Sequence, residues 1–130
     1  MSNKKVIYTS KAPSPIGPYS QAVQCGNLVF ISGQIALDTI GNLVTATSIE
    51  DEIIQVFENI KNICEESGAT LNDIVKINLY LTDLSNFNVV NNIMAEYFHY
   101  PYPARAVVEV TGLPKGANFE AEAILALDSK

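Results

Sequence analysis

The sequence predicts an α+β protein in which two helices cover one face of a six-stranded mixed β-sheet. Two stretches repeat their apolar residues with the period of an amphipathic helix, whereas the other apolar runs are short or alternate with polar residues. The order along the chain is strand, hairpin, helix, strand, helix and two strands, which favours helices on a single face. The 130 residues suffice for one hydrophobic core, so we interpret residues 1–130 as a single domain.

The strands are indicated by short apolar runs. Residues 22–24 and 27–31 are joined by Cys25-Gly26-Asn27, a sequence typical of a hairpin turn. Further along, apolar residues alternate with polar ones, as in a half-buried strand: Val75, Ile77, Leu79 and Leu81 against Lys76, Asn78, Tyr80 and Thr82. Residues 107–110 and 119–127 complete the set.

The first helix is predicted from Ile49, with Thr47 or Ser48 as its N-cap and Gly68 as a left-handed stop. Its apolar residues share one face, and Glu52 is assigned to the polar side with the other charged residues. The expected inner residues are Ile53, Val56, Phe57, Ile60, Ile63 and Cys64.

The second helix is expected to begin near Asp83 or Ser85 and to end before Pro101. Its inner face is predicted to carry Phe87, Val90, Met94, Tyr97 and Phe98.

The composition favours some classes of protein over others. With 48% hydrophobic and 17% charged residues, the chain is apolar for its size, and an uncovered sheet face predicts packing against copies of itself. The net charge of -6 makes nucleic acid an unfavoured ligand.

Cys25 and Cys64 form no cluster with other ligands, so neither a disulfide framework nor a metal site is indicated. No apolar run is long enough to span a bilayer, and we expect a cytoplasmic protein.

Arg105 and Glu120 are the strongest candidates for chemistry, because each lies in a run that is otherwise apolar. A guanidinium can hold a carboxylate by two parallel hydrogen bonds, and a glutamate can position or activate a water. The alternative for Arg105 is a salt bridge to Glu109, Glu120 or Glu122. Glu122 shares the strand face of Glu120, which would allow a paired-carboxylate acid/base device, but for Glu122 we favour solvation or a salt bridge.

Three other segments carry weaker signals. His99 lies at a helix end beside prolines, where capping explains it better than catalysis. Ser32 and Gly33 follow an apolar strand; they form an ordinary turn or allow a ligand to approach the backbone. Tyr19 lies in a loop stiffened by three prolines, either as a packed surface aromatic or as a cover over a small ligand.

Together these segments resemble the Rid family of reactive intermediate deaminases, also called the YjgF family. Residues 12–22 resemble its N-terminal loop, residues 29–35 its central strand and turn, and residues 103–105 with the Glu120 strand its C-terminal signature. The resemblance implies a fold similar to that of bacillus-type chorismate mutase, a homotrimer with clefts between subunits, and no cofactor. It also implies hydrolysis of 2-imino acids or enamines, such as 2-iminobutyrate and 2-iminopropionate, to 2-oxo acids and ammonia.

The resemblance assigns roles residue by residue. Arg105 would hold the substrate carboxylate and Glu120 would position the attacking water. Tyr19 would cover the ligand, and Ser32 and Gly33 would line the pocket. Val107 stands where many members have cysteine, and Thr111, Phe119 and Ala121 also depart from the common pattern, which leaves the preferred imino acid open.

Two alternatives remain at this stage. The same arginine would suit a regulatory trimer that senses 2-oxo acids with little turnover. Some relatives are described as ribonucleases or translation inhibitors, but the acidic charge balance and the lack of a histidine pair weigh against that activity here.

Overall fold

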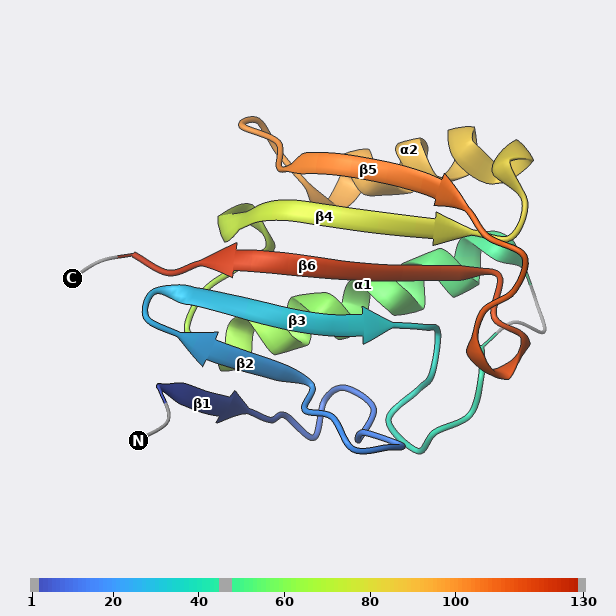
Figure 1. Ribbon diagram of the computed structural model, residues 1–130. Coiled ribbons are helices and arrows are strands. Elements are labelled where there is room, and N and C mark those ends of the chain that lie inside the picture. The colour runs from blue at the N-terminus through green and yellow to red at the C-terminus, as the bar shows by residue number, and fades with distance from the viewer. Residues whose placement is uncertain (1–2, 45–47, 129–130) are drawn as a thin grey trace.

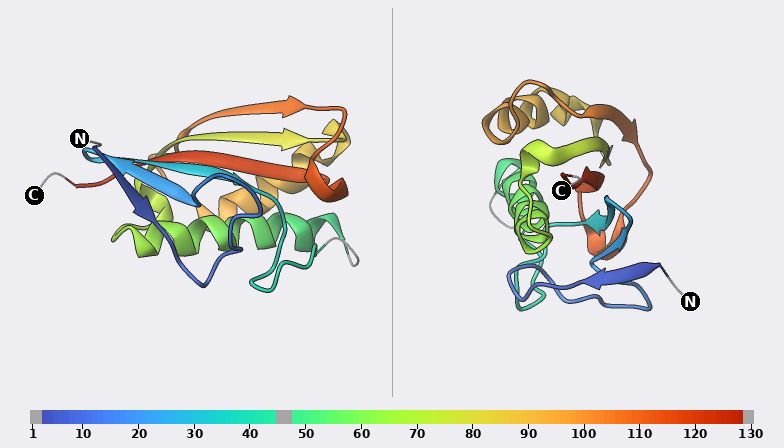
Figure 2. Two further views of the ribbon diagram at one scale, coloured as in Figure 1. Left: turned by 60° about the horizontal axis from the view of Figure 1, so that its bottom comes forward. Right: turned by 90° about the vertical axis from the view of Figure 1, so that its left-hand side faces the viewer.

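The computed structural model describes residues 3–44 and 48–128 and has the predicted α+β architecture (Figure 1). One sheet has the strand order β1-β2-β3-β6-β4-β5. It is mixed, because β4 and β5 run parallel and the other pairs run antiparallel. Both helices pack on one face, so the other face has no covering layer within the described chain (Figure 2). The elements are β1 Lys4–Ile7, β2 Ala22–Cys25, β3 Leu28–Gln34, α1 Ile49–Glu66, β4 Ile74–Leu81, α2 Phe87–Tyr97, β5 Ala104–Glu109 and β6 Phe119–Ala126.

The predicted hairpin is confirmed as β2 and β3. Cys25 pairs with Leu28, and Gly26 has a positive φ of 63°, a conformation that favours glycine in a tight turn. At the other end of β3, the register with β6 shifts between Ile31 and Gln34. This irregularity contains Ser32 and Gly33, and it lies beside the start of β6, where Gln34 pairs with Ala121.

Helix α1 begins at the predicted N-cap Ser48, whose Oγ accepts a hydrogen bond from the Asp51 N–H at 3.1 Å. Thr47 lies outside the described residues. The helix ends at Glu66, just before Gly68 with φ 84°. All six predicted inner residues are buried.

The prediction that Glu52 faces solvent is wrong. Its side chain is 1% exposed, and its carboxylate accepts hydrogen bonds from the Asn118 N–H at 2.6 Å, the Asn118 Nδ2 at 3.0 Å and the Phe119 N–H at 3.1 Å. Three donors replace the water that burial removes, so the carboxylate is accommodated inside. Glu52 thereby ties α1 to the first residue of β6.

Helix α2 is preceded by a 3-10 turn, Leu84–Asn86, which Asp83 caps by accepting the Ser85 N–H. Val90 and Met94 are buried as predicted. Phe98 is buried too, but it lies just beyond the helix end, and Tyr97 is partly buried. Phe87 is 37% exposed rather than internal, because it lies in the first turn and faces the side chain of Arg105.

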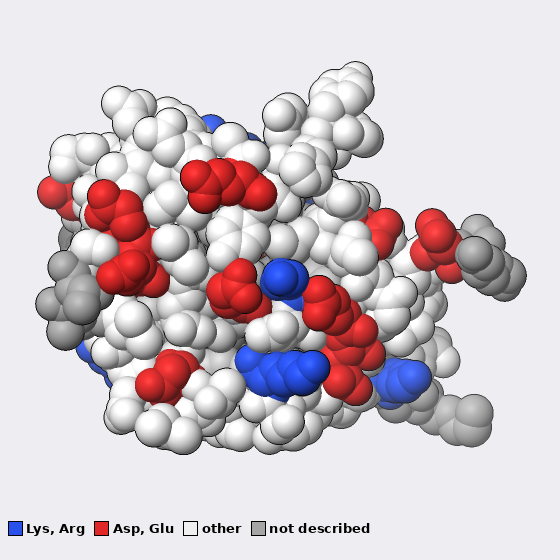
Figure 3. Space-filling view, turned by 180° about the vertical axis from the view of Figure 1, so that it is seen from behind, with Lys and Arg blue, Asp and Glu red and all other residues white. Residues whose placement is uncertain are grey.

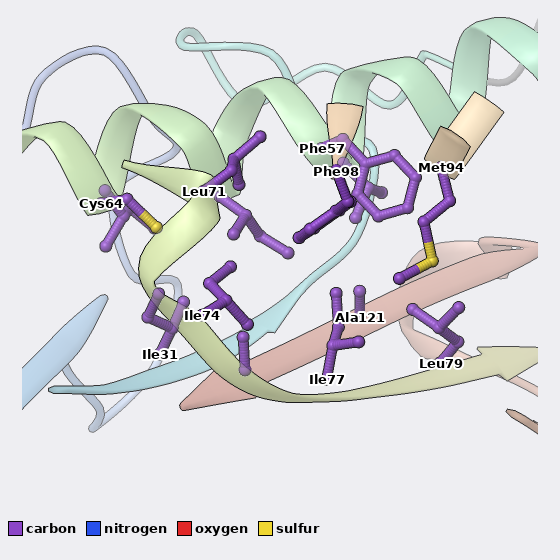
Figure 4. Close-up of a cluster of buried hydrophobic side chains, with 14 of the residues drawn as sticks. Ile31, Phe57, Cys64, Leu71, Ile74, Ile77, Leu79, Met94, Phe98 and Ala121 are labelled. Carbon is purple, nitrogen blue, oxygen red and sulfur yellow. The ribbon is translucent and has the colours of Figure 1, made fainter. Parts of the chain in front are cut away.

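The core lies between the sheet and the helices (Figure 4). Phe57 of α1 is central, and its ring packs edge-to-face against Phe98 and Phe119 at 5.7 and 5.8 Å between ring centroids. Ile77 and Leu79 of β4 face it from the sheet. Phe119 therefore anchors the start of β6 in the core.

The expected burial of Val75 is wrong, since 47% of its surface is exposed. The register between β4 and β6 shifts between Ile74 and Lys76, and this shift places Ile74 inside in its stead. Beyond it, Ile77, Leu79 and Leu81 are buried as predicted.

Seen from the helix side, carboxylates outnumber the scattered Lys and Arg side chains, which form no basic stripe on that face (Figure 3). Among the described residues, no helix combines the length and the apolar character needed to cross a membrane.

Candidate active site

A cleft of about 440 Å³ lies where β3 ends and β6 begins. The loop before β2 and the segment after β3 close its sides. Its walls are mainly apolar, with a few polar groups from the two strands. The lining residues are Pro13, Ile16, Tyr19, Gln21, Ser32, Gly33, Gln34, Ile35, Leu37, Pro114, Glu120 and Glu122. Four of the residues predicted for the site, Tyr19, Ser32, Gly33 and Glu120, therefore line one cleft.

Glu120 is the acidic centre of this cleft. Its carboxylate is half-buried and makes no hydrogen bond or ion pair within the described residues. Burial raises the pKa of Glu120 above its ordinary value, and the negative charge of Glu122 raises it further. A carboxyl with these properties is suited to exchange protons with a bound water or ligand.

Gly33 faces Glu120 across the strands. A β-carbon built on Gly33 would overlap Oε2 of Glu120, so glycine leaves room for the carboxylate in its present position. The neighbouring Ser32 donates its hydroxyl hydrogen to the Ser20 carbonyl at 2.6 Å, and its N–H donates to the Gln21 carbonyl at 2.9 Å. Its hydroxyl therefore fixes the loop before β2.

Tyr19 lies on that loop with 47% of its surface exposed, and its hydroxyl accepts the Ile16 N–H at 3.2 Å. The loop is held from beneath by Gln21, which sequence reasoning missed. The buried Gln21 side chain accepts the Thr9 N–H at 2.7 Å and donates to the Pro13 carbonyl at 2.9 Å. Because these bonds satisfy buried backbone groups of the loop, the tyrosine is carried on a rigid support.

Glu122 shares the cleft face with Glu120 and has two neutral partners. The Tyr80 hydroxyl donates to its Oε2 at 2.6 Å, and the Asn78 Nδ2 donates to the same oxygen at 3.2 Å. The bond to Glu122 raises the pKa of Tyr80 to about 12. Among the described residues Glu122 forms no salt bridge; its partly exposed carboxylate accepts hydrogen bonds from β4.

Arg105 lies on the other face of the sheet. It pairs in register with Ile77, whose side chain points to the helices, whereas Glu120 pairs with Tyr80 on the uncovered face. The guanidinium donates to Asn91 Oδ1 at 2.6 Å and lies 5.4 Å from the centroid of the Phe87 ring. Asn91 is a second residue that sequence reasoning missed.

The alternative in which Arg105 forms a salt bridge to Glu109, Glu120 or Glu122 is wrong for the described chain. Glu109 accepts the Leu84 N–H instead, at 2.9 Å. Arg105 is exposed at a groove of about 230 Å³ that Tyr102 and Pro103 also line. Its charge is thus available to an anion.

A single copy of the chain does not bring all of the predicted site residues together. Val107 lies on the same face as Arg105 and packs against the core. None of the described residues that line the Glu120 cleft is lysine or arginine. The cation and the acid therefore belong to separate surfaces of one chain.

The remaining candidates lie elsewhere. His99 is exposed and lines a groove with Lys61 and Glu65, away from the cleft. Cys64 is buried, which raises the pKa of its thiol to about 12, and Cys25 is exposed at the hairpin. Within the described residues, no group of three or more His, Cys, Asp or Glu side chains is arranged to hold a metal ion.

Known proteins share both the sequence and the fold. A 2-iminobutanoate/2-iminopropanoate deaminase from Dermatophagoides farinae is 45% identical over 98% of this chain and 100% of its own length. The crystal structure of RidA from an Antarctic Psychrobacter bacterium is 49% identical, with a TM-score of 0.90 over 95% of this chain and 99% of that one. The structure of E. coli TdcF with bound serine is 35% identical, with a TM-score of 0.89 over 96% of this chain and 100% of that one.

The family model described as Endoribonuclease L-PSP matches residues 9–127, which include the cleft, Arg105 and both helices. Family membership thus rests on nearly the whole chain, in sequence and in fold. The chain belongs to the Rid family, also called the YjgF family.

Proposed function

We propose that this protein hydrolyses 2-imino acids and their enamine tautomers, such as 2-iminobutyrate and 2-iminopropionate, to 2-oxo acids and ammonia. The observation that carries the proposal is Glu120, a half-buried carboxyl without a hydrogen-bond partner among the described residues, with its pKa raised, in a mainly apolar cleft. The name of the Dermatophagoides farinae relative supports the same reaction.

Glu120 acts first as a base and then as an acid. It takes a proton from water as the water oxygen bonds to the iminium carbon, and the C=N π electrons move to nitrogen. Glu120 then returns this proton to the amine nitrogen. The C–N bond then breaks, and its electron pair leaves with ammonia. At the same time the electron pair of the hydroxyl O–H bond forms the new C=O bond, and the hydroxyl proton passes to Glu120. Ammonia finally takes up that proton, which restores the carboxylate.

A second copy of the chain supplies the substrate clamp in this proposal. The cleft has Glu120 but no cation among its described lining residues, whereas Arg105 is exposed on the opposite face with its charge unpaired by a carboxylate. A cyclic homotrimer that brings Arg105 of one subunit to the Glu120 cleft of the next completes the site, and the guanidinium then binds the substrate carboxylate through two hydrogen bonds. The uncovered sheet face, with exposed Phe30 and Val108, supports such packing.

The test measures ammonia and 2-oxo acid release from enzymatically generated 2-iminobutyrate. The wild-type protein is expected to accelerate release over buffer, and both Arg105→Ala and Glu120→Ala are expected to abolish the acceleration. Lys61→Ala, which removes a cation from the His99 groove, is the matched control and is expected to keep full activity. A folded wild-type protein that gives no acceleration would contradict the proposal.

A sensor of 2-oxo acids is the second candidate, and the bound serine in the TdcF structure favours a small ligand with a carboxylate for that relative. Calorimetric titration with 2-oxobutyrate separates the two functions. If Glu120→Ala binds the oxo acid as the wild type does, and the wild type shows no hydrolysis, the sensor is the correct function. The net charge of -6 weighs against RNA as the substrate.

A further inference from the structure

We propose that Glu122 is a positioning residue for this reaction, a fixed anion beside Glu120 that keeps it ready to accept a proton. This inference rests on the proposed function. Glu122 lies two residues after Glu120 on β6, and both side chains line the same cleft. In a strand, residues two apart lie on one face, so their carboxylates are neighbours.

The position of Glu122 is fixed by hydrogen bonds rather than by solvent. Both contacts, from Tyr80 at 2.6 Å and from Asn78 at 3.2 Å, reach the same oxygen, and both donors come from β4. Tyr80 is directly opposite Glu120 in register, and its hydroxyl reaches across to Glu122. Neither donor carries a charge. The hydrogen bonds therefore hold the side chain without neutralising it by an opposite charge.

No other charged group faces Glu120 from the elements that surround it in the described chain. β3 contributes the backbone of Gly33 with the uncharged Ser32 and Gln34, and the loop before β2 contributes Tyr19. From β4 the titratable group is Tyr80. Lys76 lines a hollow beyond Glu122, on the side away from the cleft, and forms no salt bridge with it.

Burial and the Glu122 charge act in the same direction on the pKa of Glu120. The proposed reaction moves a proton onto Glu120 and off again, and such a shuttle works best when the pKa of the group is near the working pH. Glu122 thus contributes to the rate without contact with the substrate's reacting atoms.

The primary experiment is a ¹³C NMR titration of the Glu120 carboxyl in the absence of substrate. It compares the wild type with Glu122→Gln and with Glu66→Gln, which removes an exposed carboxylate at the end of α1. The titration midpoint of Glu120 is expected to move to lower pH in Glu122→Gln and to stay in place in Glu66→Gln. A midpoint in Glu122→Gln that stays in place or rises would overturn the proposal.

Glu122→Asp separates charge from packing. It keeps the anion and is expected to hold the midpoint near the wild-type value, whereas a fall to the glutamine level would assign the effect to the hydrogen bonds and overturn the proposal. If near-UV circular dichroism shows that Glu122→Gln disrupts the packing of the fold, Glu122→Ser takes its place, and the Glu120 midpoint is again expected to move to lower pH.

Kinetics provide the second measurement. The acid limb of the pH profile of kcat/KM for 2-iminobutyrate is expected to move to lower pH in Glu122→Gln, with KM changed by less than about two-fold. An unchanged limb would overturn the proposal. The two proposals fail in different measurements. If the deaminase proposal is wrong, the wild type releases no ammonia. If the Glu122 proposal is wrong, the Glu120 midpoint does not fall in Glu122→Gln, and this titration needs no turnover.

Discussion

The carboxylate of Glu120 occupies the space beside Gly33 that a side chain at that position would fill. A larger residue after Ser32 would therefore force the Glu120 carboxylate to move, before any ligand is considered. Gly33 lies in the strand irregularity at the end of β3, and Glu120 lies at the start of β6. Their contact fixes where the carboxylate points into the cleft.

Gly33→Ala is expected to displace the Glu120 carboxylate and lower kcat for imine hydrolysis on the order of 100-fold, because a shift of about 1 Å in a reacting group has such effects. Gly112→Ala is the control, since a β-carbon there meets no atom within 4 Å. Steady-state kinetics on both variants make the comparison. Equal activity in Gly33→Ala and wild type would show that the carboxylate position is unimportant.

Mixing two inactive variants tests whether the site is shared. In a cyclic trimer of Arg105→Ala and Glu120→Ala subunits, a site is intact only when its arginine and its glutamate come from different variants. Unfolding and refolding an equal mixture is expected to restore about a quarter of the wild-type activity. Each variant refolded alone is the control. No recovery, with mixed trimers demonstrated by mass spectrometry, would place both groups in one subunit.

Asn91→Ala is expected to raise KM about tenfold with little change in kcat, because the amide accepts a charge-assisted hydrogen bond that orients the Arg105 guanidinium. Asn92→Ala changes an exposed neighbour on the same helix and should leave both constants unchanged. Initial rates over a range of imine concentrations give the two constants. A loss confined to kcat would indicate that Asn91 acts on the reaction rather than on binding.

The raised pKa of Glu120 also predicts a pH-dependent effect on stability. The folded chain binds this proton more tightly than the unfolded chain, so ionised Glu120 destabilises the fold at neutral pH. The penalty disappears as the pH falls through the folded pKa toward the unfolded value of about 4.3. Glu120→Gln should therefore be more stable than wild type at pH 7, by denaturant titration, with a smaller difference at pH 4. A glutamine variant less stable at pH 7 would contradict this.

Periodic patterns predicted the elements well, because burial of one face imposes a period on α1 and β4. The same pattern also places Glu52 and Asn59 on the buried face of α1, but we assigned Glu52 to the polar side because of its charge. Both lie at helical spacing from Val56, within the apolar stripe, and both are buried with hydrogen bonds to backbone groups. Polar residues inside such a stripe indicate a backbone segment that needs partners.

The candidate residues were predictable one by one, but their arrangement was not. The face on which Arg105 lies depends on the register of β5 with β4. The alternation of β5 separates Arg105 and Glu109 from an apolar set, and burial alone would turn the apolar set toward the helices. The structure places the apolar set on the uncovered face instead. Gln21 was missed for another reason, since its partners are carbonyl and N–H groups of an irregular loop, which have no sequence signature.

The link from Glu52 to the first residue of β6 spans 67 positions along the chain. Its carboxylate bonds the amide hydrogens of Asn118 and Phe119, so those hydrogens are shielded from solvent only while α1 is in place. In hydrogen exchange the Phe119 amide should consequently report the opening of α1 rather than fraying of its own strand. Glu120 follows Phe119 directly along β6. The free energy of opening α1 therefore also limits how often the backbone beside Glu120 is released.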